Sequence, residues 1–286
     1  MVVCDKDKTI MNSWFSLFVV MGLSSLQATE GIKKISLPLI HDLQRADLYI
    51  LRLNEEPTGL LVLSPGCNGN GKDWIQDSTW QQFAKEHKLD LVGLSFASDV
   101  SRLKDGYGYY YASQGSGQLL LDGIRQVYHR NLPMTMYGFS GGAHFTSGFV
   151  EWKPDQVRAW CAYSAEWWVQ PVQNASCPPG LVACGEKDGR YGASLIYFKQ
   201  GRALNKPWLW MCVPNTGHST DLSAEKFIRD YLGVILDQND PNTIGEWVDI
   251  DLKAVVSPEM ANNQASVAGW LPDAKLFPEW KEVHHP

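Results

Sequence analysis

The sequence predicts an α/β protein in which helices cover both faces of a mostly parallel sheet. Short apolar runs bounded by turn residues alternate with longer segments of helical spacing over most of the chain. This alternation is typical of right-handed strand–helix–strand crossovers. One run, 60–63, is apolar at every position, as expected of a strand buried on both faces. With 286 residues, the chain is long enough for one large domain with a well-buried core.

The expected strands and helices follow one another in a regular order. The first two strands, 32–39 and 46–53, are predicted to be antiparallel and to lie near one edge of the sheet. Ligands of such sheets bind beyond the carboxyl ends of the parallel strands. The later strands are expected at 59–63, 89–96, 133–137, 157–164, 181–184 and 208–213, and the helices at 74–88, 118–130, 141–152, 194–204 and 224–236.

The two ends of the chain differ in composition from the α/β part. Lys6 and Lys8 precede an apolar run at 14–23, and small residues follow it up to Ala28, which is the layout of a secretory signal. We therefore expect residues 1–28 to be a signal peptide and the protein to be secreted or periplasmic. An amphipathic N-terminal helix or a disordered tail is the alternative. Residues 29–240 are expected to form one α/β domain, and the turn-rich segment 241–286 to pack on it as an appendage.

The charge and the cysteines of the chain indicate which partners, disulfides and metals to expect. The net charge is −6 and no basic run occurs, so neither nucleic acid nor a stable membrane association is expected. Cys161, Cys184 and Cys212 fall in expected strands, where a thiol serves as a small hydrophobe. The sequence leaves open whether two other cysteines form a disulfide. No Cys-x-x-Cys pair or histidine cluster indicates a metal, and His284 and His285 are expected in a solvated tail.

The strand at 133–137 leads into the pentapeptide Gly138-Phe139-Ser140-Gly141-Gly142, and a helix is expected to begin directly after Ser140. A serine on such a sharp strand-to-helix turn needs small neighbours, because the turn is strained and larger side chains would clash. This is the pattern of a nucleophile elbow. We therefore predict that Ser140 is a nucleophile.

Asp188 and His218 follow Ser140 in the chain, each just after an expected strand. The three residues should therefore meet at one edge of the sheet. An imidazole can accept the serine proton and later return it, and a carboxylate can hold the second ring nitrogen in the required tautomer. Glu186 and Asp221 are the alternative carboxylates, although Asp221 is also a natural helix cap. The prediction is a Ser140–His218–Asp188 triad.

Two backbone N–H groups are needed to stabilise the oxyanion of such a reaction. One is expected from Gly141, the residue after the nucleophile. The other is expected from the glycine-rich loop 64–71, where the Cys67 N–H is favoured and that of Asn68 is the alternative. The glycines of this loop allow its backbone to approach a substrate closely. No P-loop lysine–serine pair is present, so phosphate binding by the loop is not favoured.

These motifs resemble those of the α/β-hydrolase superfamily, near the polyhydroxybutyrate-depolymerase, feruloyl-esterase and dienelactone-hydrolase-like groups of serine esterases. The resemblance implies an α/β-hydrolase fold and hydrolysis of carboxylic esters, aryl or polymeric ones included, through an acyl-enzyme and without a cofactor. A serine peptidase of the same fold and a non-catalytic binding protein on this scaffold are the alternatives. The resemblance runs from about residue 60 to residue 236 and rests on Pro65-Gly66-Cys67-Asn68-Gly69, the Ser140 pentapeptide, Gly185-Glu186-Lys187-Asp188 and Gly217-His218.

Several aromatic residues are expected near this edge of the sheet. Trp167 and Trp168 follow the strand at 157–164, Tyr109 lies in a tyrosine-rich loop, and Trp74 stands near the loop 64–71. We predict that these four residues contact the substrate, and burial in the core is the alternative. Such contacts would suit a substrate with an aromatic or extended apolar part.

Overall fold

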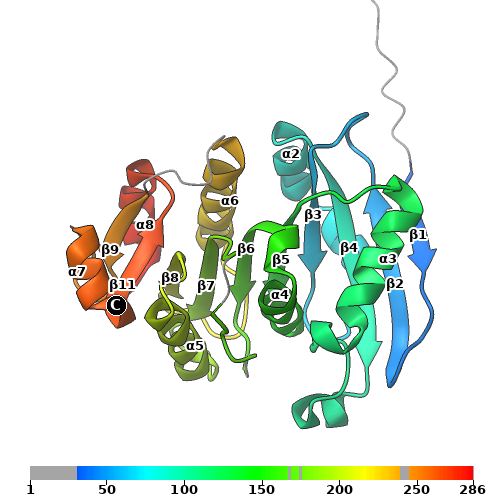
Figure 1. The fold of residues 1–286 in the computed structure, drawn as a ribbon, viewed down its shortest axis with the longest axis horizontal. Coiled ribbons are helices and arrows are strands. Elements are labelled where there is room, and N and C mark those ends of the chain that lie inside the picture. The colour runs from blue at the N-terminus through cyan, green and yellow to red at the C-terminus, as the bar shows by residue number, and fades with distance from the viewer. Residues whose placement is uncertain (1–30, 167–168, 174–175, 239–244, 286) are drawn as a thin grey trace, which may run out of the picture.

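The computed structural model describes residues 31–166, 169–173, 176–238 and 245–285, and its centre is an eight-stranded sheet (Figure 1). The strand order is β1-β2-β4-β3-β5-β6-β7-β8. β1 and β2 are antiparallel to each other, β2 is antiparallel to β4, and all the remaining neighbours are parallel. The strands are β1 (Lys33–Ser36), β2 (Leu43–Leu51), β3 (Gly59–Ser64), β4 (Leu89–Ser98), β5 (Met134–Phe139), β6 (Val157–Tyr163), β7 (Gly180–Gly185) and β8 (Trp208–Val213).

Helices flank this sheet, so the predicted α/β class is confirmed, as is the antiparallel pair at one edge (Figure 1). Every residue of β3, β4, β7 and β8 is buried, which explains why these strands are mostly apolar. The helices that connect them are α1 (Gly71–Ile75), α2 (Ser78–Glu86), α3 (Ser116–Tyr128), α4 (Gly141–Trp152), α5 (Tyr191–Ala203) and α6 (Leu222–Asp237).

The helix predicted at 74–88 is wrong in one respect, because the chain forms two helices there. Asp77 lies between α1 and α2 in an extended conformation, and its carboxylate accepts hydrogen bonds from the N–H groups of Thr79 and Trp80. An aspartate that caps a new helix in this way interrupts the one before it. α1 also lies directly on β4, since a Cβ atom on Gly71 would be 2.3 Å from the carbonyl carbon of Gly93.

The C-terminal part of the described chain contains structure that no sequence pattern predicted. β9 (Glu246–Asp249), β10 (Ala254–Val256) and β11 (Ala268–Leu271) form a second, antiparallel sheet in the order β10-β9-β11. α7 (Pro258–Asn263) and α8 (Phe277–Val283) accompany it. β11 and α8 both contact β8, the edge strand of the main sheet (Figure 1).

The predicted solvated tail at His284 is wrong. The His284 side chain is 1 % exposed and stacks on Trp280, with ring centroids 4.6 Å apart. Its Nδ1 accepts a hydrogen bond from the Cys212 N–H at 3.0 Å, and its Nε2 donates to the Ile250 carbonyl at 2.7 Å. The neutral imidazole therefore ties the appendage to the edge of β8, and burial lowers the pKa of His284 to about 4.

Acid is expected to destabilise this docking. The pKa of His284 is lower in the folded protein than the value near 6.5 of an exposed histidine, so its contribution is complete above about pH 6.5 and is lost as the pH falls towards about 4. The difference corresponds to about 3 kcal/mol of unfolding free energy. Denaturant titrations over this pH range should show that the free energy of unfolding falls more steeply with decreasing pH for the wild type than for His284→Gln. The glutamine offers a similar acceptor and donor but does not titrate, and parallel pH profiles for the two proteins would contradict the prediction.

Cysteines and membrane-spanning segments complete the description. Cys161, Cys184 and Cys212 are buried in strands as predicted, and all five cysteines in the described ranges are free thiols. Over those same ranges, no helix combines the length and the apolar character that a bilayer crossing requires. The predicted signal peptide at 1–28 lies outside the described residues.

Candidate active site

Ser140 occupies a strained turn between β5 and α4. Its backbone has φ 54° and ψ −114°, a conformation that is costly for a residue with a side chain and that often marks a functional position. Glycines on both sides make the turn possible. A Cβ atom on Gly138 would lie 2.2 Å from the Gly142 carbonyl oxygen, and one on Gly142 would lie 1.8 Å from the Ser64 carbonyl oxygen. The two glycines therefore allow β5, α4 and the end of β3 to pack closely enough to present Ser140.

His218 and Asp188 extend from the loops after β8 and β7 and form one chain of hydrogen bonds with Ser140. The His218 Nε2 atom is 2.9 Å from Ser140 Oγ, and its Nδ1 atom is 2.7 Å from Asp188 Oδ2. The ring of His218 stacks on that of Phe139, with centroids 5.0 Å apart. The imidazole is thus hydrogen-bonded to a hydroxyl through one ring nitrogen and to a carboxylate through the other, the arrangement that allows a proton to leave the hydroxyl.

The Asp188 carboxylate is buried yet remains suited to the ionised state. Its residue is 5 % exposed, and Oδ1 accepts hydrogen bonds from the backbone N–H of Arg190 at 3.1 Å and from the Arg190 guanidinium at 3.2 Å. Burial by itself raises the pKa of Asp188, but the hydrogen bonds from His218, Arg190 and Ser164 outweigh it and lower the pKa below its usual value.

The two alternative carboxylates lie elsewhere. A Glu186 side-chain oxygen accepts a hydrogen bond from the Asn215 N–H at 2.8 Å. The Asp221 carboxylate caps α6, where it accepts from the N–H groups of Ser223 and Ala224. Of the three acidic residues, Asp188 is therefore the one whose carboxylate is hydrogen-bonded to His218.

The glycine-rich loop after β3 lies against the start of α4. A Cβ atom on Gly66 would be 3.7 Å from Ser140 Cβ, and one on Gly141 would be 2.8 Å from the Cys67 nitrogen. The backbones of Cys67 and Gly141 are thus in contact beside Ser140. Neither N–H donates to a backbone or side-chain acceptor among the described residues. Two such N–H groups can donate to a negatively charged oxygen that forms next to the serine.

Arg45 on β2 holds this loop, and sequence reasoning missed it. Its Nη2 atom donates to the carbonyl oxygens of Asn68 and Gly69, at 2.6 Å each, and its Nε atom donates to the Ser95 carbonyl at 3.1 Å. One guanidinium therefore joins the loop to both β2 and β4. Nothing in the local sequence around Arg45 signals this role, because its partners are more than twenty positions away.

Asn68 provides a second attachment of the same loop. It has a left-handed backbone with φ 54°, and its side-chain amide pairs with the backbone of Ser98 at the end of β4, donating to the carbonyl at 2.9 Å and accepting from the N–H at 3.0 Å. The backbone N–H of Asn68 donates to the Tyr109 hydroxyl at 3.1 Å. That N–H is therefore already engaged, which favours Cys67 over Asn68 as the second oxyanion donor.

The predicted substrate contact of Tyr109 is wrong. Its side chain is 2 % exposed and its hydroxyl faces Asn68, so Tyr109 supports the loop from inside the protein. Trp74 is half-buried on α1, with its ring 5.4 Å from that of Tyr137, and its contact with substrate stays a prediction. Trp167 and Trp168 lie outside the described residues.

The described residues contain no group of three or more His, Cys, Asp or Glu side chains arranged to hold a metal ion. The chemistry available at this edge of the sheet is that of a hydroxyl, an imidazole, a carboxylate and backbone N–H groups. Such a set supports nucleophilic attack on an acyl carbon.

Comparisons with known proteins identify the fold. No protein-family model and no curated protein sequence matches the chain. Among solved structures, the chain is similar to the fluorophosphonate-binding serine hydrolase F of Staphylococcus aureus, with 15 % identity, a TM-score of 0.52, and coverage of 72 % of this chain and 99 % of that one. It is also similar to an S-formylglutathione hydrolase of the same organism, with 16 % identity, a TM-score of 0.53 and the same coverages.

An esterase of Pyrococcus furiosus is a third similar structure, with 9 % identity, a TM-score of 0.52, and coverage of 72 % of this chain and 91 % of that one. At identities this low, the similarity concerns the path of the backbone. It agrees with the strand order, the parallel centre of the sheet and the turn at Ser140. The chain therefore has the α/β-hydrolase fold.

Proposed function

We propose that this protein is a serine hydrolase that cleaves carboxylic esters through an acyl-enzyme intermediate. The observation that carries the proposal is the unbroken chain of hydrogen bonds from Ser140 through His218 to Asp188. The N–H groups of Cys67 and Gly141, which lie side by side next to Ser140, support it. The similar solved structures include proteins named as a serine hydrolase, an esterase and an S-formylglutathione hydrolase, and these names agree with the proposal.

In the acylation step, Ser140 Oγ attacks the carbonyl carbon of the ester while its proton passes to His218 Nε2. The carbonyl oxygen becomes an oxyanion that accepts hydrogen bonds from the Cys67 and Gly141 N–H groups. When the tetrahedral intermediate collapses, the bond to the alcohol oxygen breaks and His218 returns the proton to that oxygen. The products of this step are a free alcohol and an acyl-Ser140 ester.

In the deacylation step, water takes the place of the alcohol. His218 accepts a proton from the water as its oxygen attacks the acyl carbon, and the same N–H groups stabilise the second oxyanion. Collapse breaks the bond to Ser140 Oγ, which regains the proton from His218. The carboxylic acid leaves, and Asp188 holds His218 in one tautomer throughout.

The substrate preference and the destination of the protein extend this proposal. The half-buried ring of Trp74 and the tryptophans at 167–168 suit an acyl or alcohol group with an aromatic or extended apolar part. The apolar run at 14–23 suits export of the protein. The export of the protein is tested by expressing it with and without residues 1–28 and comparing the masses of the two purified products.

The proposal is tested by p-nitrophenyl esters of increasing acyl length, combined with covalent labelling by an alkyl fluorophosphonate. We expect ester turnover, and we expect one phosphonyl group to attach to the peptide that contains Ser140, with loss of turnover in proportion to labelling. The matching p-nitroanilides serve as the control for a peptidase. Anilide cleavage that exceeds ester cleavage would replace the proposal by a peptidase, and no turnover together with no labelling would leave a binding protein.

Arg45→Met is expected to lower kcat for ester hydrolysis by roughly 10- to 100-fold with little change in KM. The substitution removes two hydrogen bonds to the loop of Cys67 and one to Ser95 on β4. A displaced oxyanion donor costs transition-state stabilisation more than substrate binding. Arg52→Met is the matched control, because Arg52 follows the other end of β2 and contacts Asp90 instead of the loop. Equal kcat values for the two variants, at equal melting temperatures, would contradict the assigned role of Arg45.

A further inference from the structure

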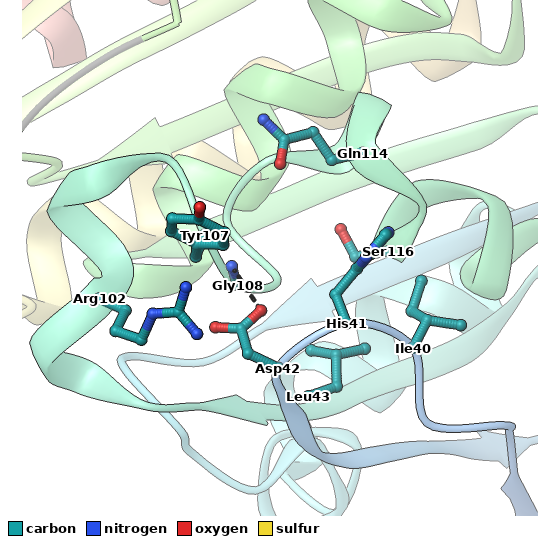
Figure 2. Close-up of a pocket in the computed structure, with 9 residues that line it drawn as sticks. All are labelled: Ile40, His41, Asp42, Leu43, Arg102, Tyr107, Gly108, Gln114 and Ser116. Atoms are coloured by element: carbon teal, nitrogen blue, oxygen red, sulfur yellow. Dashed lines mark hydrogen bonds between the residues drawn. The ribbon is translucent and has the colours of Figure 1, made fainter.

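A cavity separate from Ser140 opens at the outer part of the same sheet edge (Figure 2). It has a volume of about 390 Å³, within the range of small-molecule sites. Its walls come from the turn before β2 (40–43) and from the loop between β4 and α3 (102–116). None of the residues discussed above as triad or oxyanion donors lines it.

The topology places this cavity well away from the elbow. Leu43 pairs with Ser98, the last residue of β4, whereas Ser140 follows β5. Three strand spacings separate β2 from β5 in the order β2-β4-β3-β5, which is roughly 14 Å across the sheet. A ligand in the cavity is therefore not positioned for attack by Ser140.

One carboxylate oxygen in the cavity wall lacks a partner. Asp42 Oδ1 accepts a hydrogen bond from the Gly108 N–H at 3.1 Å, whereas Asp42 Oδ2 is buried and has no hydrogen-bond partner among the described residues. Leaving a buried carboxylate oxygen unpaired is costly. A donor supplied by a bound molecule would remove that cost.

A positive charge faces the same space. The guanidinium of Arg102 lies over the ring of Tyr107, 3.9 Å from its centroid, and points with Asp42 into the cavity (Figure 2). Across the described residues, no ion pair joins Arg102 to Asp42. The two opposite charges thus line one cavity without forming an ion pair with each other.

The remaining walls combine apolar and polar side chains, because His41, Gln114 and Ser116 line the cavity together with Ile40 and Leu43 (Figure 2). Ile40 and Leu43 provide the apolar surface. Gly108 and Gly115 have left-handed backbones, with φ of 93° and 120°, and a Cβ atom at either position would come within about 2.6 Å of a neighbouring leucine or isoleucine side chain. These close approaches leave no room for a larger residue at Gly108 or Gly115 and fix the path of the backbone around the cavity.

We propose that this cavity binds a short zwitterionic acid, in which an ammonium group pairs with Asp42 and a carboxylate pairs with Arg102. An amino acid with a small alkyl chain satisfies both charges and places its alkyl carbons against Ile40 and Leu43. Hydrogen bonds between ionised partners are the stronger kind, so each of the two pairs should contribute measurably. The assignment stands independently of the esterase activity.

The test measures binding of four probes to the full chain by saturation-transfer NMR and by thermal shift. The probes are 2-aminobutyrate and 4-aminobutyrate, together with butyrate, which lacks the ammonium, and propylamine, which lacks the carboxylate. We expect at least one of the two amino acids to bind 10-fold or more tightly than butyrate or propylamine. Binding should persist after Ser140 has been labelled with a fluorophosphonate, because the cavity is remote from the elbow.

Two variants connect the binding to the cavity residues. Asp42→Asn retains an oxygen for the Gly108 N–H. In this variant the affinity for the amino acid should fall to the affinity of the wild type for butyrate. In Arg102→Gln the affinity for the amino acid should fall to the affinity of the wild type for propylamine. Both variants should keep the melting temperature and the ester turnover of the wild type.

Three results would overturn the assignment. They are no binding of either amino acid at millimolar concentration, equal binding to the wild type and both variants, and loss of binding on Ser140 labelling. The last result would move the ligand to the elbow and leave the esterase proposal intact. Failure of ester hydrolysis, by contrast, would not affect the binding data.

Discussion

Ser140→Ala is expected to reduce kcat for p-nitrophenyl ester hydrolysis by at least about 10⁴-fold. The Ser140 hydroxyl is hydrogen-bonded to His218, and without it no acyl-enzyme forms. The oxyanion donors of Cys67 and Gly141 remain, so a small residual rate above that in water is expected. Steady-state kinetics of the purified variant measure the effect, and a burst of p-nitrophenol in the wild type should be absent from the variant.

The fold of Ser140→Ala should be intact, because alanine occupies the same strained backbone conformation as serine at this position. Equal melting temperatures for the two proteins are the control. A variant of Ser140 that retains wild-type kcat would exclude the nucleophile assignment.

Asp188→Asn is expected to reduce kcat by roughly 10³- to 10⁴-fold with KM nearly unchanged. The Asp188 carboxylate accepts a hydrogen bond from the protonated Nδ1 of His218, with 2.7 Å between Oδ2 and Nδ1. An asparagine amide can instead donate to Nδ1, which places the ring proton on Nε2 and prevents that atom from accepting the proton of Ser140. The measurement is kcat and KM across the pH range in which the wild type is active.

Glu186→Gln is the matched control for Asp188→Asn. The two residues are two positions apart in one loop, and both carry a carboxylate, but Glu186 contacts the Asn215 N–H instead of His218. If Glu186→Gln lowered kcat as much as Asp188→Asn does, the charge of the loop, and not the hydrogen bond to His218, would control the rate.

Much of the main sheet was predictable because its signals are local. The runs at 60–63 and 208–213 are apolar along their length, and the corresponding strands are buried at every residue. The helix predicted at 141–152 has those bounds in the structure. The pentapeptide around Ser140 also carries its own evidence, since its glycines are required by close backbone contacts within a few residues or with the neighbouring strand end.

The C-terminal appendage was not predictable in the same way. Its strands are three or four residues long, which is too short for a periodic pattern to show. His284 illustrates the consequence. A histidine near the end of a polar segment is usually solvated, and only its contacts with Cys212 and Ile250 show that it is buried.

The alternation of strands and helices, the turn at Ser140 and the order of Ser140, Asp188 and His218 along the chain could all be inferred from the amino-acid sequence. These features depend on spacing and residue type over a few positions. The folded structure was needed to show that Arg45 holds the loop of Cys67, that Tyr109 faces inward, and that Asp42 and Arg102 line one cavity. Those relations join segments far apart in the chain, and they arise from the order in which strands pair and from which side chains then share a buried space, neither of which a local pattern encodes.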